Sequence, residues 1–393
     1  MDLPERLLMG SGPSTVPARI LEAMAAPTIG HLDPAFLALT DEANELLRRA
    51  MRTENAATFP VSGTGSAGME AMLVNFLEPG DRLVVGVCGI FGARIADAAG
   101  RLGAEVVRVD AEPGTAVDRD ALAAALEPGA AALAIVHGET STGVAQPLEG
   151  LAELVRERDA LLLVDCVTSL AGYPLAVDEL GIDVAFSGTQ KCLNCPPGLA
   201  PLTVGDRARE RLGARATKVA SWCFDLEAIL AYWAAGERVY HHTPPVNTIY
   251  ALREALAIVD EEGLEPRWRR HERAADALLA GLAELGIEPL VAPARRLNAL
   301  TTVVPGERID EAAVRGRLLE EDGIEISGGL GPLKGRVWRI GTMGVNADIG
   351  PVARLVGAIA AIVEPDAAGE AERRVAESWS AGDLGERLVA EGA

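Results

Sequence analysis

Lys191 lies in a stretch of small and polar residues, SGTQKCLNCPPG, that spans positions 187–198. An apolar run at 184–186 precedes this stretch and its last residues form a Pro-Pro-Gly turn, so neither an exposed helix nor an apolar core explains the lysine well. A lysine held at the end of a strand can form a Schiff base with pyridoxal phosphate, which serves enzymes that make and break carbon–nitrogen bonds. The sequence therefore predicts a cofactor-linked lysine.

Such a lysine needs three partners: an acid under the pyridine nitrogen, a cradle for the phosphate and a cation for a substrate carboxylate. Asp165 directly follows the apolar run 161–164, where a carboxylate needs a cationic partner. The turn SGTGSAG at 62–68 opens a helical pattern, as phosphate-binding turns do. Arg339 stands between apolar residues in a strand-like run. The ordinary alternatives are a helix cap for Asp165, plain packing for the turn and a structural ion pair for Arg339.

Short apolar runs alternate with helical patterns through the first half of the chain and predict the elements that hold these residues. This α/β alternation favours a largely parallel sheet covered by helices on both faces, in which ligands gather at the carboxyl ends of the strands. The expected strands lie at 82–87, 105–109, 132–136, 161–164 and 184–186.

A break with the sequence GLEP at 263–266 predicts the start of a second, smaller α/β domain. We expect an N-terminal arm at 1–20, a large domain at 21–262, a small domain at 263–364 and an acidic tail at 365–393. The basic run RWRRH at 267–271 is expected to form the solvated face of a helix. The glycine-rich start, GSGPS at 10–14, suits a backbone that passes close to another group, although an ordinary N-terminal arm is the default interpretation.

Composition excludes several classes of function. The chain has 393 residues and a formal net charge of −21, which argues against unaided binding to nucleic acid or to an anionic membrane surface. No stretch has the apolar length of a membrane helix or the layout of a secretory signal. An odd number of cysteines suits reduced thiols in the cytoplasm.

Two patterns could indicate a metal site. Cys192 and Cys195 form a C-x-x-C pair, but no second pair of ligands follows at the usual spacing, and small buried side chains are the preferred interpretation. His241 and His242 are adjacent, so on an extended chain they should face opposite ways, and no third ligand is near in the sequence. We expect no metal.

Taken together, these motifs resemble the class V aminotransferases of fold type I, closest to the alanine:glyoxylate and serine:glyoxylate aminotransferases. The resemblance runs from about Met9 to Glu364. The matching segments are SGTG at 62–65, HGETSTG at 137–143, LVD at 163–165, SGTQK at 187–191, YHHT at 240–243 and WRIG at 338–341.

The resemblance implies a homodimer with shared active sites, a large domain with a mostly parallel sheet of the seven-stranded type, and pyridoxal 5'-phosphate bound as an aldimine on Lys191. Asp165 would keep the pyridine nitrogen protonated, Phe91 would stack on the ring and Val167 would pack against its other face. The remaining assignments are phosphate contacts for Thr64, Gly65, Ser66 and Gln190, phosphate contacts from the partner subunit for Tyr240 and Thr243, a place near the phenolic oxygen for Thr140, and the substrate carboxylate for Arg339.

The implied reaction is a ping-pong transamination between a small amino acid, alanine or serine, and a small 2-oxo acid, glyoxylate or pyruvate. The alternative is (S)-ureidoglycine:glyoxylate transamination. The segments at 30–34 and 331–343 also resemble the enzymes of that subgroup, which carry amide residues in place of His31 and Tyr240. A cysteine desulfurase would need a nucleophilic cysteine late in the chain, and none follows Cys223. Loss of Lys191, Asp165 or Arg339 would indicate a non-catalytic binding or structural dimer, and all three are present. A dinucleotide oxidoreductase is disfavoured because the turn at 62–68 does not fit G-x-G-x-x-G with an acidic residue at the usual distance.

Overall fold

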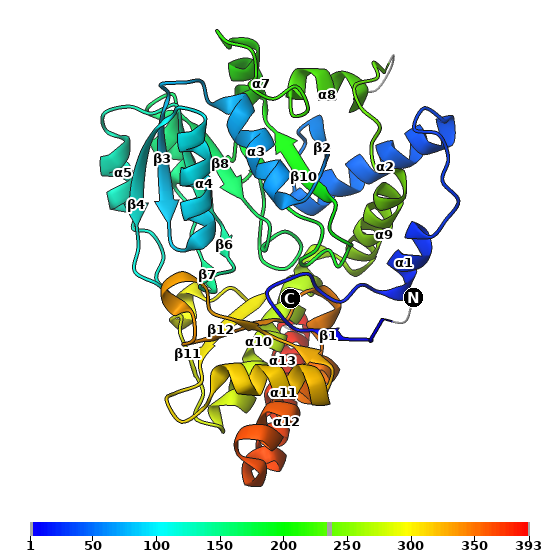
Figure 1. Ribbon diagram of the computed structural model, residues 1–393, viewed down its shortest axis with the longest axis vertical. Coiled ribbons are helices and arrows are strands. Elements are labelled where there is room, and N and C mark those ends of the chain that lie inside the picture. Colours follow the sequence, from blue (N-terminus) through cyan, green and yellow to red (C-terminus); the bar gives the residue numbers. More distant parts are fainter. Residues whose placement is uncertain (1–2, 234–237, 392–393) are drawn as a thin grey trace.

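The computed structural model describes residues 3–233 and 238–391, which form a large and a small α/β unit in contact (Figure 1). The large unit is built on a seven-stranded sheet in which β10 runs antiparallel to the other six strands. In spatial order the strands are β2 (Ala57–Ser62), β10 (Leu199–Val204), β9 (Val184–Phe186), β8 (Leu161–Asp165), β5 (Ala132–Val136), β3 (Arg82–Val87) and β4 (Glu105–Asp110). The predicted, largely parallel sheet is confirmed.

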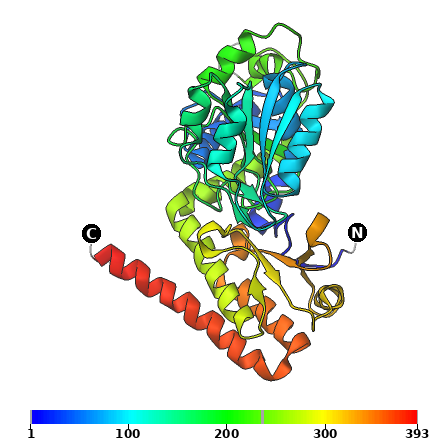
Figure 2. The same ribbon diagram turned by 90° about the vertical axis from the view of Figure 1, so that its left-hand side faces the viewer.

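The central strands are buried along their whole length because helices cover both faces of the sheet (Figure 2). α2 begins where the Asp33 side chain accepts a hydrogen bond from the Ala35 N–H and Pro34 takes the first helical position. The helices of this unit are α1 (Ala18–Met24), α2 (Pro34–Met51), α3 (Gly65–Phe76), α4 (Ile90–Arg101), α5 (Arg119–Leu126), α6 (Leu151–Arg156), α7 (Asp206–Gly213), α8 (Leu226–Trp233) and α9 (Val246–Glu262). A two-stranded ribbon joins β6 (Gly138–Glu139) to β7 (Val144–Ala145).

The small unit has a four-stranded sheet of β11 (Glu288–Pro289), β12 (Leu300–Val304), β15 (Trp338–Gly341) and β14 (Ser327–Gly328). Its apolar core gathers around Trp338, which is fully buried. Its helices are α10 (Leu264–Ala283), α11 (Glu311–Glu321), α12 (Ile349–Val363) and α13 (Ala368–Glu391), with short 3-10 turns η1 (Pro293–Arg295), η2 (Gly331–Leu333), η3 (Gly344–Asn346) and η4 (Pro365–Ala367).

The acidic stretch after 364 is mostly the helix α13, which packs along α10 and α12 and buries Ala371 and Val375 (Figure 2). The basic run 267–271 is not a solvated helix face, and that prediction was wrong. Arg267 is 2% exposed because it lies where α10 meets the large unit, and His271 is fully buried, with its Nε2 accepting from the Gly344 N–H of η3. Arg267 is paired with Glu262 and donates to the carbonyl oxygens of Ala171 and Cys192.

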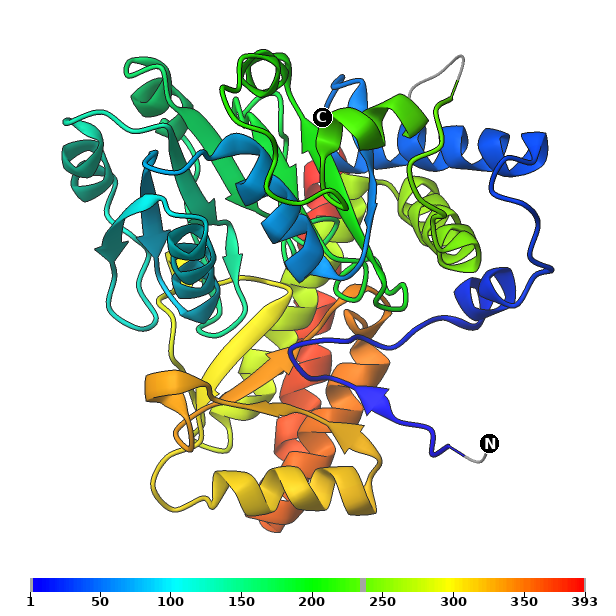
Figure 3. The same cartoon turned by 45° about the horizontal axis from the view of Figure 1, so that its top comes forward.

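The N-terminal segment crosses the junction between the two units (Figure 3). β1 (Leu7–Leu8) pairs with β13 (Ile324–Glu325) of the small unit. The Gly341 N–H donates to the carbonyl of Met9, and a Cβ atom on Gly341 would overlap the carbonyl oxygen of Gly10. This close backbone contact brings residues 10–12 to the turn that carries Lys191.

Among the described residues, no helix is both long and apolar enough to cross a membrane. No group of three or more potential metal ligands occurs in that part of the chain either. The two adjacent histidines do not face opposite ways as predicted, since their Nδ1 atoms lie 2.7 Å apart.

Candidate active site

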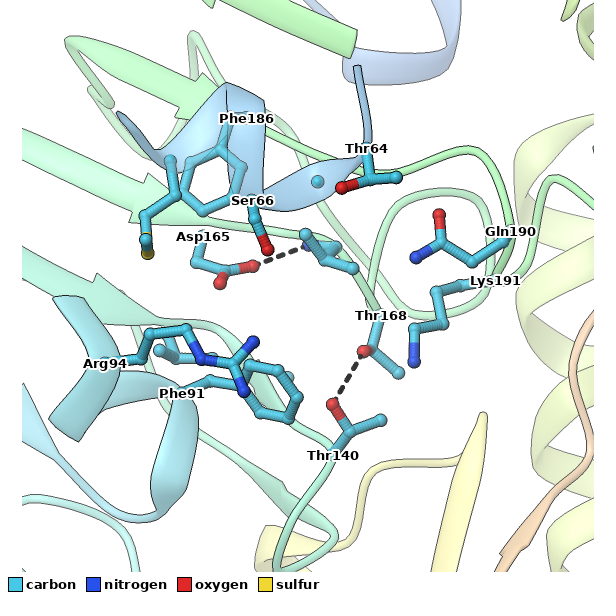
Figure 4. A pocket seen from close by; sticks show the side chains of 15 residues that line it. Thr64, Ser66, Phe91, Arg94, Thr140, Asp165, Thr168, Phe186, Gln190 and Lys191 are labelled. Atoms are coloured by element: carbon cyan, nitrogen blue, oxygen red, sulfur yellow. Dashed lines mark hydrogen bonds between the residues drawn. The ribbon is translucent and has the colours of Figure 1, made fainter. Parts of the chain in front are cut away.

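One cavity at the carboxyl ends of β5, β8 and β9 collects nine of the residues singled out in the sequence (Figure 4). It has about 630 Å³ of empty space including its mouth, within the range of small-molecule sites. Parallel strands end at the same edge of a sheet, so residues far apart in sequence meet there. The nine are Thr64, Gly65, Ser66, Phe91, Thr140, Asp165, Val167, Gln190 and Lys191.

Asp165 ends β8 and lines the cavity while only 6% of its surface is exposed. Its Oδ1 accepts a hydrogen bond of 2.8 Å from the Val167 N–H. Burial raises the pKa of Asp165 to about 7, against the opposing effects of this hydrogen bond and of the positive charge on Lys191. A cation placed in the cavity would therefore stabilise the carboxylate.

Lys191 follows β9 on the far side of the cavity from Asp165 (Figure 4). Its Nζ donates to the carbonyl oxygen of Ser11, and burial lowers its pKa to about 8. A Cβ atom on Gly12, whose φ is +101°, would lie 2.7 Å from Nζ. The predicted close passage of the glycine-rich start is thus confirmed, and Lys191 is enclosed by backbone.

The turn before α3 forms one end of the cavity. Thr64 is the N-cap of α3, yet within residues 3–233 and 238–391 its side chain makes no capping hydrogen bond. The Oε1 of Gln190 is buried there without a partner in the same described part of the chain. A helix N-terminus with an unused hydroxyl suits an anionic group, to which Gln190 could donate only from its Nε2, because its unpaired Oε1 is an acceptor.

Phe91 opens α4 and lines the cavity, and the guanidinium of Arg94 lies 4.8 Å above its ring. Glu139 holds this helix end in place, since its carboxylate accepts from the N–H groups of Phe91 (3.1 Å) and Gly92 (3.3 Å). Burial raises the pKa of Glu139 above its ordinary value. Neither Arg94 nor Glu139 was predicted as a site residue, although the glutamate inside HGETSTG was a visible signal.

Arg339 lies behind the cavity and is 5% exposed. Its Nε donates to the carbonyl of Gly328 (2.8 Å) and its Nη1 to the carbonyl of Thr140 (3.0 Å). The alternative, a structural ion pair, is not supported, because no carboxylate within the described ranges lies within 4 Å of the Arg339 guanidinium. Within the described residues, three of the five guanidinium N–H donors are thus left for an anion.

Two of the predicted cofactor contacts are not in the cavity of their own chain. Tyr240 is 53% exposed, and its hydroxyl lies 3.1 Å from the Oγ1 of Thr243, which is also exposed.

The C-x-x-C thiols are buried, and burial raises the pKa of Cys192 and Cys195 to about 12, so both stay protonated. This agrees with their interpretation as small buried side chains.

Residues 7–334 match the sequence profile of the family Aminotransferase class-V. The chain belongs to this family. An alanine–glyoxylate aminotransferase of Callithrix jacchus is 43% identical over 353 residues, covering 88% of this chain and 85% of that protein.

Two solved structures extend the likeness to three dimensions. The alanine–glyoxylate aminotransferase of Nostoc sp. superimposes with a TM-score of 0.90 at 49% identity, covering 91% of this chain and 95% of the other. The ureidoglycine–glyoxylate aminotransferase of Bacillus subtilis gives a TM-score of 0.93 at 37% identity, with 96% and 99% covered. The protein is an aminotransferase of fold type I, as the sequence predicted.

Proposed function

We propose that this enzyme transfers the amino group of alanine or serine to glyoxylate or pyruvate with bound pyridoxal 5'-phosphate, in ping-pong order. The observation that carries the proposal is the meeting of Lys191 and Asp165 across one cavity whose end is the open start of α3. The alanine–glyoxylate enzymes among its relatives support the choice of substrates.

The residues present fit this cofactor. A protonated pyridine nitrogen is the cation that the buried carboxylate of Asp165 lacks. A phosphate would accept from the hydroxyls of Thr64 and Ser66, from the N–H groups at the start of α3 and from the amide Nε2 of Gln190, but not from its Oε1. Phe91 and Val167 both line the cavity and would enclose a flat ring between them. Thr140 lies at the opposite end of the cavity from Thr64, on the side expected for the phenolic oxygen (Figure 4).

The cofactor, when bound, supplies an aldehyde for the lysine and an aromatic system that accepts electrons from the substrate carbon. Lys191 provides the amine that binds it and, once free, moves a proton to and from the substrate's α carbon. Because burial lowers the pKa of Lys191 to about 8, a usable fraction of this amine is unprotonated near neutral pH. Arg339 holds the substrate carboxylate, and Asp165 holds a proton on the ring nitrogen.

A homodimer completes the site in this proposal. Tyr240 and Thr243 do not line the cavity of their own chain and would reach the phosphate of the partner subunit. Exposed apolar side chains surround them: Leu32 (52% exposed), Trp222 (70%) and Val239 (60%). His31 lies 5.1 Å from the Tyr240 ring and His241 lies 4.3 Å from Trp222, so these residues form one patch of the kind that marks an interface.

Ureidoglycine as amino donor is the second candidate. The high TM-score with the ureidoglycine–glyoxylate enzyme of Bacillus subtilis favours it, while His31 and Tyr240 favour the smaller donors.

A cytoplasmic location is also proposed, supported by five free cysteines.

The test is an absorbance spectrum of the purified protein with pyridoxal phosphate, followed by separate addition of alanine, serine and ureidoglycine. We expect the visible band to bleach with one donor and to return on addition of glyoxylate. If no band forms, the cofactor assignment is wrong. If only ureidoglycine bleaches it, the second candidate replaces the first.

We expect Arg339→Lys to raise the Michaelis constants for the amino donor and the oxo acid by about tenfold each, because a point charge replaces a planar fork. The cofactor band should stay unchanged, since Arg339 lies outside the cavity lining. Steady-state kinetics with both substrates varied would measure this. Unaltered constants would show that another residue binds the carboxylate.

A further inference from the structure

A pair of serine hydroxyls lies beside Arg339. Ser327 in β14 stands directly opposite Arg339 in β15, and Thr302 in β12 stands opposite it on the other side. Side chains of directly opposed residues in an antiparallel sheet lie on the same face. The row of Thr302, Arg339 and Ser327 therefore faces the large unit, where Arg339 meets the carbonyl of Thr140.

The hydrogen bonds of Ser327 leave its hydroxyl proton to be donated. Its Oγ accepts from the N–H of Ser11 at 2.9 Å and from the Oγ of Ser11 at 3.1 Å. A hydroxyl oxygen has two lone pairs and one proton, so both lone pairs are occupied and the proton remains to be donated. Across residues 3–233 and 238–391, the structure shows no acceptor for this proton.

Ser11 and Ser327 also lie between Lys191 and Arg339, the two residues that the proposed function assigns to the α carbon and to the carboxylate of the substrate. The carbonyl oxygen of Ser11 accepts from the Nζ of Lys191. On the other side, the Nε of Arg339 donates to the carbonyl of Gly328, the residue after Ser327. A substrate whose α carbon lies at Lys191 and whose carboxylate lies at Arg339 would pass along these hydroxyls.

We infer that Ser327 is a further substrate-binding residue, whose hydroxyl donates to the carboxylate that Arg339 holds, and that Ser11 orients this hydroxyl. An O–H proton beside a guanidinium is stabilised by an anion that accepts from both groups, and a carboxylate has two oxygens for them. The inference rests on the proposed function for the assignment of Arg339. It extends to every small monocarboxylic amino acid or 2-oxo acid that the enzyme uses.

The primary experiment measures binding of acetate to the cofactor-loaded enzyme by titration calorimetry. Acetate carries the carboxylate but no amino group or side chain, so it isolates this contact. We expect Ser327→Ala to weaken acetate binding about tenfold, as for the loss of one hydrogen bond to a charged group. The Michaelis constants for alanine and for glyoxylate should rise by a similar factor while kcat stays nearly unchanged.

Thr302→Val is the matched control, because Thr302 is also opposite Arg339 but its Oγ1 is buried against the Gly143 backbone. It should leave acetate binding unchanged. Ser11→Ala removes one of the two donors to Ser327 and keeps the backbone N–H, so it should weaken acetate binding by a smaller factor, about twofold to threefold.

Three results would overturn the inference: unchanged acetate binding in Ser327→Ala, a rise confined to the Michaelis constant of serine, or loss of the cofactor band in that variant. The second result would mean that the hydroxyl contacts the donor's side chain, and the third that Ser327 is structural. Failure of the wild type to transaminate glyoxylate would instead contradict the proposed function, while the acetate measurement would still decide the role of Ser327.

Discussion

Replacing Lys191 with alanine should remove the visible cofactor band and lower transamination by more than about 10⁴-fold, because one side chain both binds the cofactor and moves the proton. The loss should not come from misfolding. The Lys191 carbonyl, which accepts from the Ser14 hydroxyl at 2.7 Å, remains in place in the variant. Melting curves of the cofactor-free proteins would check this.

The sequence allows an unusually direct version of this experiment. It contains only three lysines, Lys191, Lys218 and Lys334, and the last two are exposed. Borohydride reduction of the loaded enzyme should therefore attach the cofactor to a single peptide, which mass spectrometry would identify. Lys218→Ala is the control and should keep both the band and the label. A label on Lys218 or Lys334, or turnover by Lys191→Ala, would contradict the assignment.

The strand ends of the large unit could be predicted because buried parallel strands leave a strong pattern of short apolar runs. The strands at β3, β5 and β9 have the predicted bounds, and β4 and β8 are each one residue longer. The residues that follow these strands then meet at one edge of the sheet, so Asp165 and Lys191 could be placed together from their positions alone.

Residues brought to the site by the small unit and by the N-terminal segment could not be predicted in this way. Ser11 contacts Ser327 across more than three hundred positions, and no local pattern encodes such a contact. The buried position of Arg267 was also missed, since a basic run looks solvated until its tertiary partners, two carbonyls and Glu262, are known.

Asp165→Asn should weaken cofactor binding and slow turnover by about 10²–10³-fold, because a neutral amide cannot hold a proton on the ring nitrogen. The amide oxygen can still accept from the Val167 N–H, so the local backbone should be kept. Asp110→Asn is the matched control, since Asp110 also ends a parallel strand, β4, but is exposed and paired with Arg108. Equal kinetics for wild type and Asp165→Asn would remove Asp165 from the site.

Without cofactor, Asp165→Asn should stabilise the folded protein above neutral pH. Burial raises the pKa of Asp165 from 3.8 to about 7, so the stability that its protonated form contributes is complete below pH 3.8 and is lost as the pH rises through 7. Asparagine stays neutral and avoids this loss. Cofactor-free Asp165→Asn should therefore have a higher melting temperature than the cofactor-free wild type at pH 8, with a smaller difference at pH 5. Adding the cofactor should raise the melting temperature of the wild type by more than it raises that of the variant. If Asp165→Asn melts below the wild type at pH 8 both with and without cofactor, Asp165 stabilises the fold and does not bind a cation in the cavity.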